Sequence, residues 1–365
     1  MTLQQTKTLC EQFFNHTVSR AEIYHIIGIA KYYAKEFEEA AKLMSDAVKE
    51  QPHRDDYHFN LGMALAACNR SEEAAAALGR SVELAPHNVE AIKQLGLILY
   101  QTGRLEKASR MLQRYLARVP DDSQALHLFG NALKQQRRLD EAKTVFKHAV
   151  SSNPKDADAF LQLGNILKVE GHPNQALEAY QGALAVKPNF TKALQNIGVV
   201  LGELGRFDEA IDVYNRAISY DPNLPEVHFN FGNILYAKQK YKTAAYRFMR
   251  ALELKPDFDE AWIHLGNTHL AEGEYDRAKT AFQQAIRINP RYAEAFYSLG
   301  NVFHSQNVNA KWVRIQSGVL FLAAKNDISS HNIDPVPASL YLKRHSAKIR
   351  KVLQDSPDAG YRLSS

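Results

Sequence analysis

The sequence has little of what an extracellular or membrane protein requires. Only two of its 365 residues are cysteines, Cys10 and Cys68, and their separation matches no metal or redox motif. We therefore expect free thiols in a reducing compartment, which favours a cytoplasmic location. The N-terminus lacks the basic start and long apolar run of a secretory signal. The longest apolar run near the C-terminus, Val319–Ala324, is too short to span a bilayer.

Most of the chain also has no net charge. The net charge of +5 comes from residues 306–365, which hold nine Lys/Arg and four Asp/Glu, whereas residues 1–305 hold 36 of each sign. A protein that collects nucleic acid needs Lys and Arg clustered on one face. We therefore expect no nucleic-acid partner.

A pattern with a period of 34 residues runs through most of the chain and is clearest between Asp259 and Tyr292. One in-phase series consists of Gly28, Gly62, Gly96, Gly130, Gly164, Gly198, Gly232, Gly266 and Gly300. A second consists of Ala40, Ala74, Ala108, Ala142, Ala176, Ala210, Ala244 and Ala278, and a third of Pro52, Pro86, Pro120, Pro154, Pro188, Pro222, Pro256 and Pro290. No insertion interrupts the register, so the three series predict one repeated architecture.

Each unit of this pattern predicts two helices, A and B, joined by a turn. Gly266 on helix A and Ala278 on helix B are small, which predicts that the two helices cross closely there. Gly273 follows helix A and suits a left-handed cap position. Pro290 prevents helix B from continuing. Such a hairpin cannot bury its apolar face alone and needs copies on either side.

The spacing Trp262–x2–Leu265–Gly266, followed by Ala278–x3–Phe282 and a closing proline, resembles the tetratricopeptide repeat (TPR) family. The resemblance implies an all-α fold, the TPR α-solenoid, in which stacked helical hairpins form a right-handed superhelix. It also implies that helices A line a concave groove through repeat positions 2, 5, 6, 9, 12 and 13.

The register divides the chain into three parts. Residues 1–20, in phase with helix B, are predicted to form an N-terminal capping half-repeat. Residues 21–305 are predicted to form the TPR array of eight full repeats and helix A of a ninth. Residues 306–365 lose the pattern and are predicted to contain a diverged C-terminal cap, a linker and a basic amphipathic helix. An alternative is that a longer reading frame was cut or frame-shifted near Gln306.

No constellation of catalytic residues stands out. The sequence lacks a glycine-rich phosphate loop after a strand, and its fourteen histidines are scattered. His25, His58 and His127 fall on helices A of different repeats, where a lone histidine is more often a packing or groove residue than a ligand. We therefore expect no enzyme activity, no cofactor and no metal site.

Amide side chains recur at positions 6 and 9 of helices A. They are Asn60, Gln94, Asn131, Gln162, Asn165, Asn196, Asn230, Asn233, Asn267 and Asn301. An amide donates and accepts hydrogen bonds at once, which suits the backbone of an extended peptide. Asn60, Asn196 and Asn230 resemble the asparagine ladder in the TPR superhelix of O-GlcNAc transferase, whereas Ile26 and Leu128 depart from it. The alternative is that these amides bond neighbouring helices and never meet a ligand.

Carboxylates occupy position 2 in seven of nine repeats: Glu22, Asp56, Glu90, Asp158, Glu226, Glu260 and Glu294. The helix dipole explains most of this preference for the first turn. Carboxylates at the rim of the groove nevertheless disfavour acidic partners, so we expect a neutral to basic protein or peptide. No three successive repeats supply the Lys, Asn and Arg set with which TPR domains of this family clamp chaperone tails.

These features favour a non-catalytic protein–protein interaction scaffold or adaptor that binds peptide segments in the concave groove. The alternative is the substrate-recognition part of an O-GlcNAc-transferase-like or other transferase system whose catalytic domain belongs to a separate chain. Self-association, with the tail of one copy in the groove of another, is a third hypothesis.

Overall fold

The computed structural model describes residues 19–305, and within this range it contains helices joined by short turns and no strand. The helices are α2 (Arg20–Tyr33), α3 (Phe37–Glu50), α4 (Asp55–Ala67), α5 (Ser71–Leu84), α6 (Val89–Gln101), α7 (Leu105–Leu116), α8 (Ser123–Gln135), α9 (Leu139–Ser152), α10 (Ala157–Val169), α11 (Pro173–Val186), α12 (Thr191–Glu203), α13 (Phe207–Tyr220), α14 (Pro225–Ala237), α15 (Tyr241–Leu254), α16 (Asp259–Ala271), α17 (Tyr275–Ile288) and α18 (Ala293–Ser305). Even-numbered helices are helices A of the repeats, and odd-numbered helices are helices B. The predicted all-α solenoid of stacked hairpins is confirmed.

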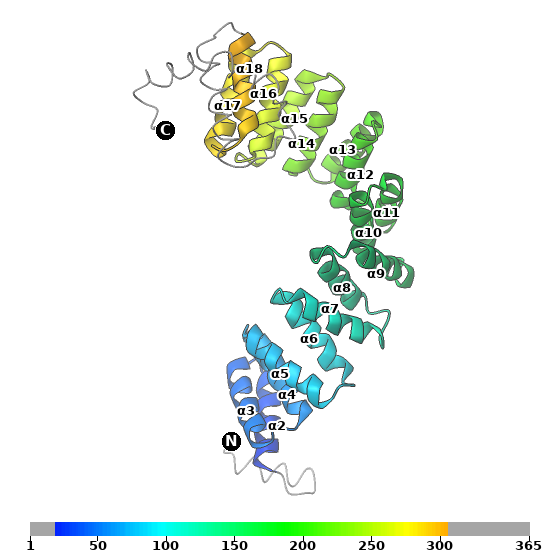
Figure 1. Cartoon of the computed structure of the whole chain (residues 1–365), viewed down its shortest axis with the longest axis vertical. Coiled ribbons are helices and arrows are strands. Elements are labelled where there is room, and N and C mark those ends of the chain that lie inside the picture. The colour runs from blue at the N-terminus through cyan, green and yellow to red at the C-terminus, as the bar shows by residue number, and fades with distance from the viewer. Residues whose placement is uncertain (1–18, 306–365) are drawn as a thin grey trace, which may run out of the picture. The chain divides into compact units, whose positions relative to one another are not determined.

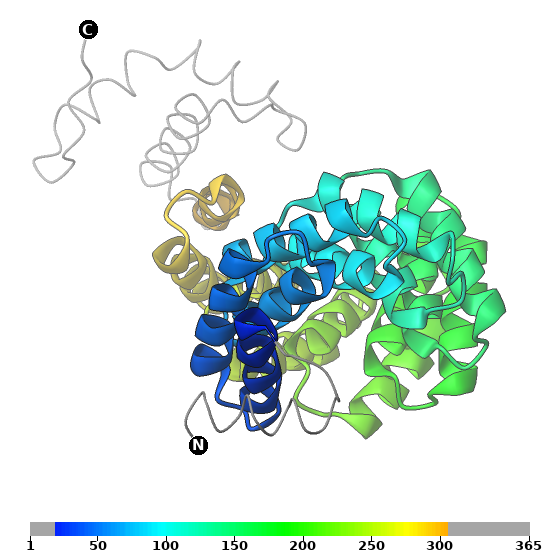
Figure 2. The same ribbon diagram turned by 90° about the horizontal axis from the view of Figure 1, so that it is seen from below.

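Two compact units make up the chain, and each is described by itself. Unit 1 (residues 1–188) contains α2 to α11, and unit 2 (residues 189–365) contains α12 to α18. The consecutive hairpins can be followed from blue to green in unit 1 and from green to orange in unit 2 (Figures 1 and 2). The predicted C-terminal part (residues 306–365) lies outside the described residues, as does the predicted N-terminal half-repeat (residues 1–20) except for Ser19 and Arg20, which cap and begin α2.

The contact between the two helices of a hairpin depends on the small residues of the repeat. A Cβ atom added to Gly232 would lie 2.5 Å from Cε1 of Phe248, and one added to Gly266 would lie 2.5 Å from Cε1 of Phe282. Both rings are fully buried, as is Ala210 on the neighbouring helix B. The predicted close crossing is therefore confirmed, since a larger side chain could enter only by displacing a buried ring.

Every A-to-B turn contains one residue with a positive φ angle. These residues are Lys35, Asn69, Gly103, Arg137, Gly171, Gly205, Gln239 and Gly273. At Gly273 φ is 75°, which confirms the predicted left-handed cap. The next amide, that of Glu274, donates to the carbonyl of His269 at 2.8 Å and so satisfies the end of α16.

Successive repeats are joined through the carbonyl of the closing proline. Nε1 of Trp262 donates to the carbonyl of Pro256 at 3.0 Å. At the same register, Nε2 of His58 donates to the carbonyl of Pro52 at 2.9 Å, as His228 does to that of the proline before it. These two histidines are therefore packing residues.

Within each unit, successive helices A also pack against one another, as α2 does with α4 and α14 with α16. No pair of successive helices B in the described residues packs as closely. Helices A therefore lie on the inner side of the curvature of each unit. We call this side the helix-A face and the opposite side the helix-B face.

Candidate functional site

All ten predicted amide residues lie on helices A, and each side chain is partly buried. In the structure they form two groups. In one group the side-chain amide is hydrogen-bonded to another side chain of the protein, and in the other group it is not. This division separates the two alternatives that the sequence leaves open, because an amide held by a neighbour is already used for packing.

Asn60 in unit 1 is held by the preceding repeat. Its Nδ2 donates to Nε2 of His25 at 2.8 Å, so that this ring nitrogen acts as the acceptor. An imidazole nitrogen accepts only when the ring is neutral. Burial lowers the pKa of His25, which favours this neutral form, and the ring also packs 4.2 Å from that of Tyr57.

Three other amides of unit 1 are held as well. The Lys134 ammonium donates to Oε1 of Gln162 in the following repeat. The Tyr180 hydroxyl donates to Oδ1 of Asn165 at 2.9 Å within one hairpin. Gln94 donates to Glu90 of its own helix at 2.8 Å. Asn131 is the exception in unit 1, since its side chain makes no hydrogen bond to residues 19–305.

Side-chain contacts to aspartates also join successive repeats on the helix-A face of unit 1. The ammonium of Lys93 lies 2.7 Å from Oδ2 of Asp122, and Nε2 of His127 lies 2.8 Å from Oδ2 of Asp156. Each aspartate also caps the next helix A by accepting from a backbone amide three residues later. Lys93 and His127 on the helix-A face of unit 1 thus already have partners within the protein.

The helix-A face of unit 2 differs in this respect. The side chains of Asn230, Asn233, Asn267 and Asn301 make no hydrogen bond to other residues within 19–305, whereas Asn196 does have an interaction partner. Oδ1 of Asn233 is buried without any partner. Asn233 as a whole is only partly buried, as are Asn230, Asn267 and Asn301.

Aromatic side chains lie beside these amides. The ring of Phe229 lies 4.8 Å from that of Phe258 and 5.1 Å from that of His264, measured between centroids. Burial lowers the pKa of His264, which keeps its ring uncharged near neutral pH. This part of unit 2 therefore offers amide groups beside an uncharged aromatic surface.

Some of the position-2 carboxylates already interact with other groups of the protein and are not available to a partner. Asp56 pairs with Arg54 at 2.7 Å, and Glu22 accepts from the backbone amide of Ser19 at 2.7 Å. In unit 2, Glu226 lies 3.6 Å from the Lys255 ammonium, and Glu226 and Glu260 are exposed at the start of their helices. The first turns of α14 and α16 therefore keep an acidic character.

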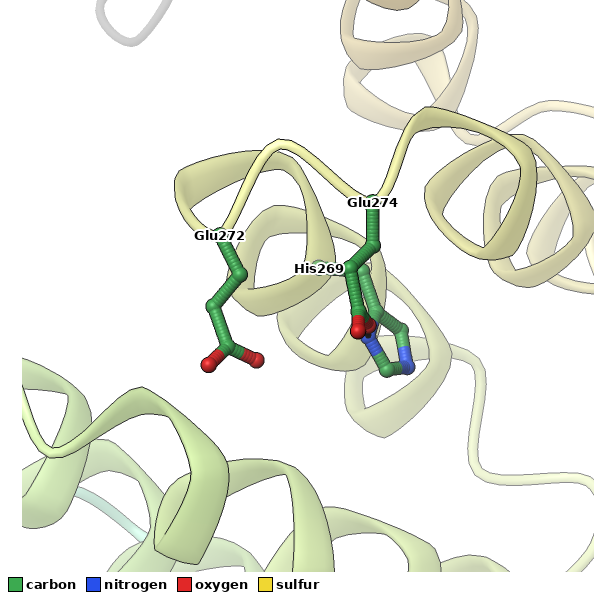
Figure 3. A group of neighbouring side chains, drawn as sticks. All are labelled: His269, Glu272 and Glu274. Carbon is green, nitrogen blue, oxygen red and sulfur yellow. Dashed lines mark hydrogen bonds and ion pairs between the residues drawn. The ribbon is translucent and has the colours of Figure 1, made fainter.

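One group of side chains in unit 2 has ligand atoms of the kind that bind metals. Atoms of His269, Glu272 and Glu274 lie within 4.8 Å of one another at the end of α16 (Figure 3). Nδ1 of His269 donates to Oε2 of Glu274 at 2.7 Å, and Arg277 also contacts this carboxylate at 3.1 Å. A guanidinium already balances the carboxylate, so we assign the group to closing the α16–α17 turn. Sequence reasoning missed this pair, although His269 is buried at the packing position three residues after Gly266, where most repeats have leucine.

Cys68 is a free thiol, as predicted. Burial raises the pKa of this thiol, with a further contribution from Glu38. A thiol with a raised pKa is a poor nucleophile, which favours a packing role. Within residues 19–305, no helix combines the length and apolar character that crossing a bilayer requires.

Comparison with protein families agrees with the architecture. Models described as TPR repeat match residues 200–239, 232–272 and 266–307, and models described as tetratricopeptide repeat match residues 27–89, 61–128 and 123–156. Together these matches cover more than half of the chain. The chain belongs to the tetratricopeptide repeat family. No curated protein matches the sequence.

Solved structures share the fold at low identity. A chain of the APC/C heterotetramer Cut9–Hcn1 is 15% identical with a TM-score of 0.52, over 89% of this chain and 76% of that one. PilW, described as a type IV pilus biogenesis factor, is 20% identical with a TM-score of 0.51, over 57% and 94%. PilF of Pseudomonas aeruginosa is 21% identical with a TM-score of 0.50, over 62% and 97%. Identities this low support the fold alone.

Proposed function

We propose that this protein is a binding scaffold whose helix-A face in unit 2 holds an extended segment of a partner protein. The observation that carries the proposal is the set of partly buried amide side chains of Asn230, Asn233 and Asn267, which make no hydrogen bond to other residues within 19–305. An extended peptide presents alternating N–H and C=O groups, which an amide side chain can satisfy in pairs.

The register supports a continuous path for such a segment. Asn233, Asn267 and Asn301 are 34 residues apart on α14, α16 and α18, and these helices pack against one another in order. Their amides therefore follow one another along the same face of unit 2. The neighbouring Phe229 ring supplies apolar contact area for side chains of the partner.

The negative charge on the helix-A face of unit 2 indicates the charge of the segment that it binds. Glu226 and Glu260 are exposed at the first turns of α14 and α16, so they repel an acidic segment and attract Lys or Arg. We propose a neutral to basic segment, bound without catalysis. The amides of unit 1 that other side chains hold, such as Asn60 and Gln162, contribute to packing in this proposal.

A combined Asn230→Ala, Asn233→Ala and Asn267→Ala variant of the full chain tests the proposal. Unstructured peptides selected on the parent protein from a display library serve as probes. If each amide contributes one hydrogen bond of about 0.5–1.5 kcal/mol and the effects add, binding weakens by about 1.5–4.5 kcal/mol. The melting temperature should not fall.

The matched control is Asn60→Ala with Gln162→Ala in unit 1. This variant should retain peptide affinity and lose thermal stability, because it removes contacts between repeats. If the unit 2 variant instead keeps its affinity and loses its melting temperature, the amides of unit 2 are structural and the proposal is wrong.

A further inference from the structure

The helix-B face of unit 1 carries a groove between α5 and α7 that lies apart from the proposed peptide-binding face. Its volume is about 560 Å³. The floor is formed by α6, and the walls by α5 and α7; the apolar lining consists of Ala75, Ala76, Gly79, Leu95, Leu99 and Met111. The rim carries Glu72, Arg104, Lys107 and Arg110. The groove is thus apolar inside and mainly basic at its edge.

The positive charge of this rim is only partly balanced. Arg104 pairs with Glu72, the single carboxylate of the rim. Lys107 and Arg110 are exposed and have no carboxylate partner among residues 19–305. Both cations lie on α7 beside the groove, and Nε of Arg110 donates to the backbone carbonyl of Glu106 in the same helix at 3.4 Å.

The neighbouring groove, between α3 and α5, provides an internal comparison. It is larger, about 830 Å³, and its charged lining balances Glu38, Glu39, Asp46 and Glu73 against Lys42, Lys49, Arg70 and Arg80. Several of these charges already pair, as Arg70 does with Glu73 at 2.7 Å and Lys49 with Asp46 at 2.8 Å. The unbalanced positive charge is therefore a property of the α5–α7 groove and not of the helix-B face as a whole.

Gly79 makes the α5–α7 groove accessible. It lies in the interior of α5, where glycine is less favourable for the helix than alanine. A Cβ atom added here would meet no atom within 4 Å, so the packing of this protein does not require glycine at this position. The missing side chain leaves space against the α5 backbone for an apolar side chain of another molecule.

We propose that this groove binds an amphipathic helix of a partner protein, with an apolar face flanked by Asp and Glu. Helices α5 and α7 contain 14 and 12 residues and bound the groove on either side. A groove of that length, about 20 Å, accommodates three to four turns of a helix. Apolar side chains at i, i+3, i+4 and i+7 then enter the groove, and the flanking carboxylates reach Lys107 and Arg110.

The positive charge of the rim favours an acidic partner helix over basic segments as the occupant of the groove. Residues 338–354 of this chain form a basic amphipathic sequence, which Lys107 and Arg110 would repel. A basic segment, which Glu226 and Glu260 favour on the helix-A face, is disfavoured for the same reason. The two faces are therefore expected to select partners of opposite charge.

A display library of peptides about 16 residues long, with apolar residues fixed at helical spacing and the other positions random, provides the probe. It is panned on the full chain and on the Gly79→Leu variant, which fills the groove. Peptides enriched on the parent chain should be rich in Asp and Glu and should bind Gly79→Leu at least about tenfold more weakly, as expected when a central pocket is filled. A Lys107→Glu and Arg110→Glu variant should weaken binding by up to about fivefold per charge pair, and more in low salt.

The matched control is Gln181→Leu, which places the same side chain at the same repeat register on α11, where the position is exposed. It should leave binding unchanged, and circular dichroism should show that both leucine variants are folded.

The proposal is overturned if the library yields no acidic peptide, or if the enriched peptides bind Gly79→Leu and the parent equally. It is also overturned if the chain alone forms oligomers that Gly79→Leu dissolves, because the occupant is then a second copy. Loss of binding in the Asn230, Asn233 and Asn267 variant would place the peptide on the other face.

Discussion

Units 1 and 2 are built from the same repeat but use the polar residues of their helix-A faces differently. In unit 1, successive repeats are connected by side chains, as Asn60 is to His25 and Lys93 to Asp122. In unit 2, the amides of Asn230 and Asn233 have no hydrogen-bond partner among the described residues. Asn60 and Asn230 occupy the same register, yet Asn60 serves packing and Asn230 has no partner among the described residues.

The difference shows what a repeat pattern determines. The residues that set the hairpin, such as Gly232 against Phe248, recur because every copy must bury the same contact. Positions on the helix-A face do not have to make this contact. In each repeat, a side chain there can bind an adjacent repeat or remain available to another molecule. The partner of a given amide depends on the residue that the adjacent repeat places opposite it. The following variants test this contrast.

The largest effect is expected at the helix crossing of unit 2. Gly232→Val should cost about 1–3 kcal/mol of the free energy of unfolding or more, because the new side chain would meet the ring of Phe248. Ala210→Leu, at a fully buried position, should have a comparable cost. Gly96→Val in unit 1 should cost less, because its Cβ would lie 3.0 Å from Cγ of Leu112, a longer contact than the one of 2.5 Å at Gly232. Circular dichroism melts give the three values, and equal melts for Gly232→Val and the parent would show that the crossing is looser than the structure indicates.

An intermediate effect is expected for single amides. Asn60→Ala should lower the free energy of unfolding by about 0.5–1.5 kcal/mol, since it removes a hydrogen bond and leaves Nε2 of His25 without its donor. Asn230→Ala should leave stability unchanged, because its side chain has no partner to lose. Urea titrations of both variants provide the comparison. Equal losses would remove the distinction between the two units.

A smaller effect of opposite sign is expected on the helix-B face. Gly79→Ala should stabilise unit 1 by up to about 1 kcal/mol, because alanine favours the helix and a Cβ meets no atom. Gly182→Ala, also within a helix B of unit 1, should not stabilise, since its Cβ would lie 2.7 Å from Cδ1 of Phe160. Thermal melts of the two variants measure the difference. A destabilised Gly79→Ala would contradict the open space at this position.

The smallest effect is expected on the pH dependence of unit 2. Burial lowers the pKa of His228 and of His264 from the ordinary value of 6.5. Their neutral form contributes its full stability above that value. As the pH falls below it, the unfolded chain takes up protons that the folded chain does not, and stability is lost. His264→Phe should reduce this loss between pH 7 and about pH 5.5, where the unfolded histidine gains its charge. If the variant and the parent have the same pH profile of melting temperature, His264 can be protonated in the folded protein without loss of stability.

The fold was predictable because its determinants are local and repeated. The left-handed turn at Gly273 and the small residues at the helix crossing follow from the 34-residue register alone. The same register could also have indicated positive φ angles at Lys35 and Gln239, which occupy the position of Gly273 but have side chains.

The candidate site was predictable only as a set of positions. The sequence places Asn60 and Asn230 at equivalent positions, but the partner of each depends on contacts between repeats and on side-chain conformation. The groove beside Gly79 was not predicted, because it depends on how far apart two helices B stand. The choice of a peptide ligand remains a proposal for the same reason.

Asp122 and Asp156 have a consequence for how unit 1 unfolds. Each carboxylate belongs to two repeats at once, because it caps its own helix and holds Lys93 or His127 of the repeat before it. Opening one hairpin therefore removes a restraint on its neighbour, which raises the free energy of any boundary between folded and unfolded repeats. A higher boundary energy lengthens the stretch of repeats that opens as a single cooperative block. In amide hydrogen exchange, α6 to α10 should accordingly share one level of protection and fray together.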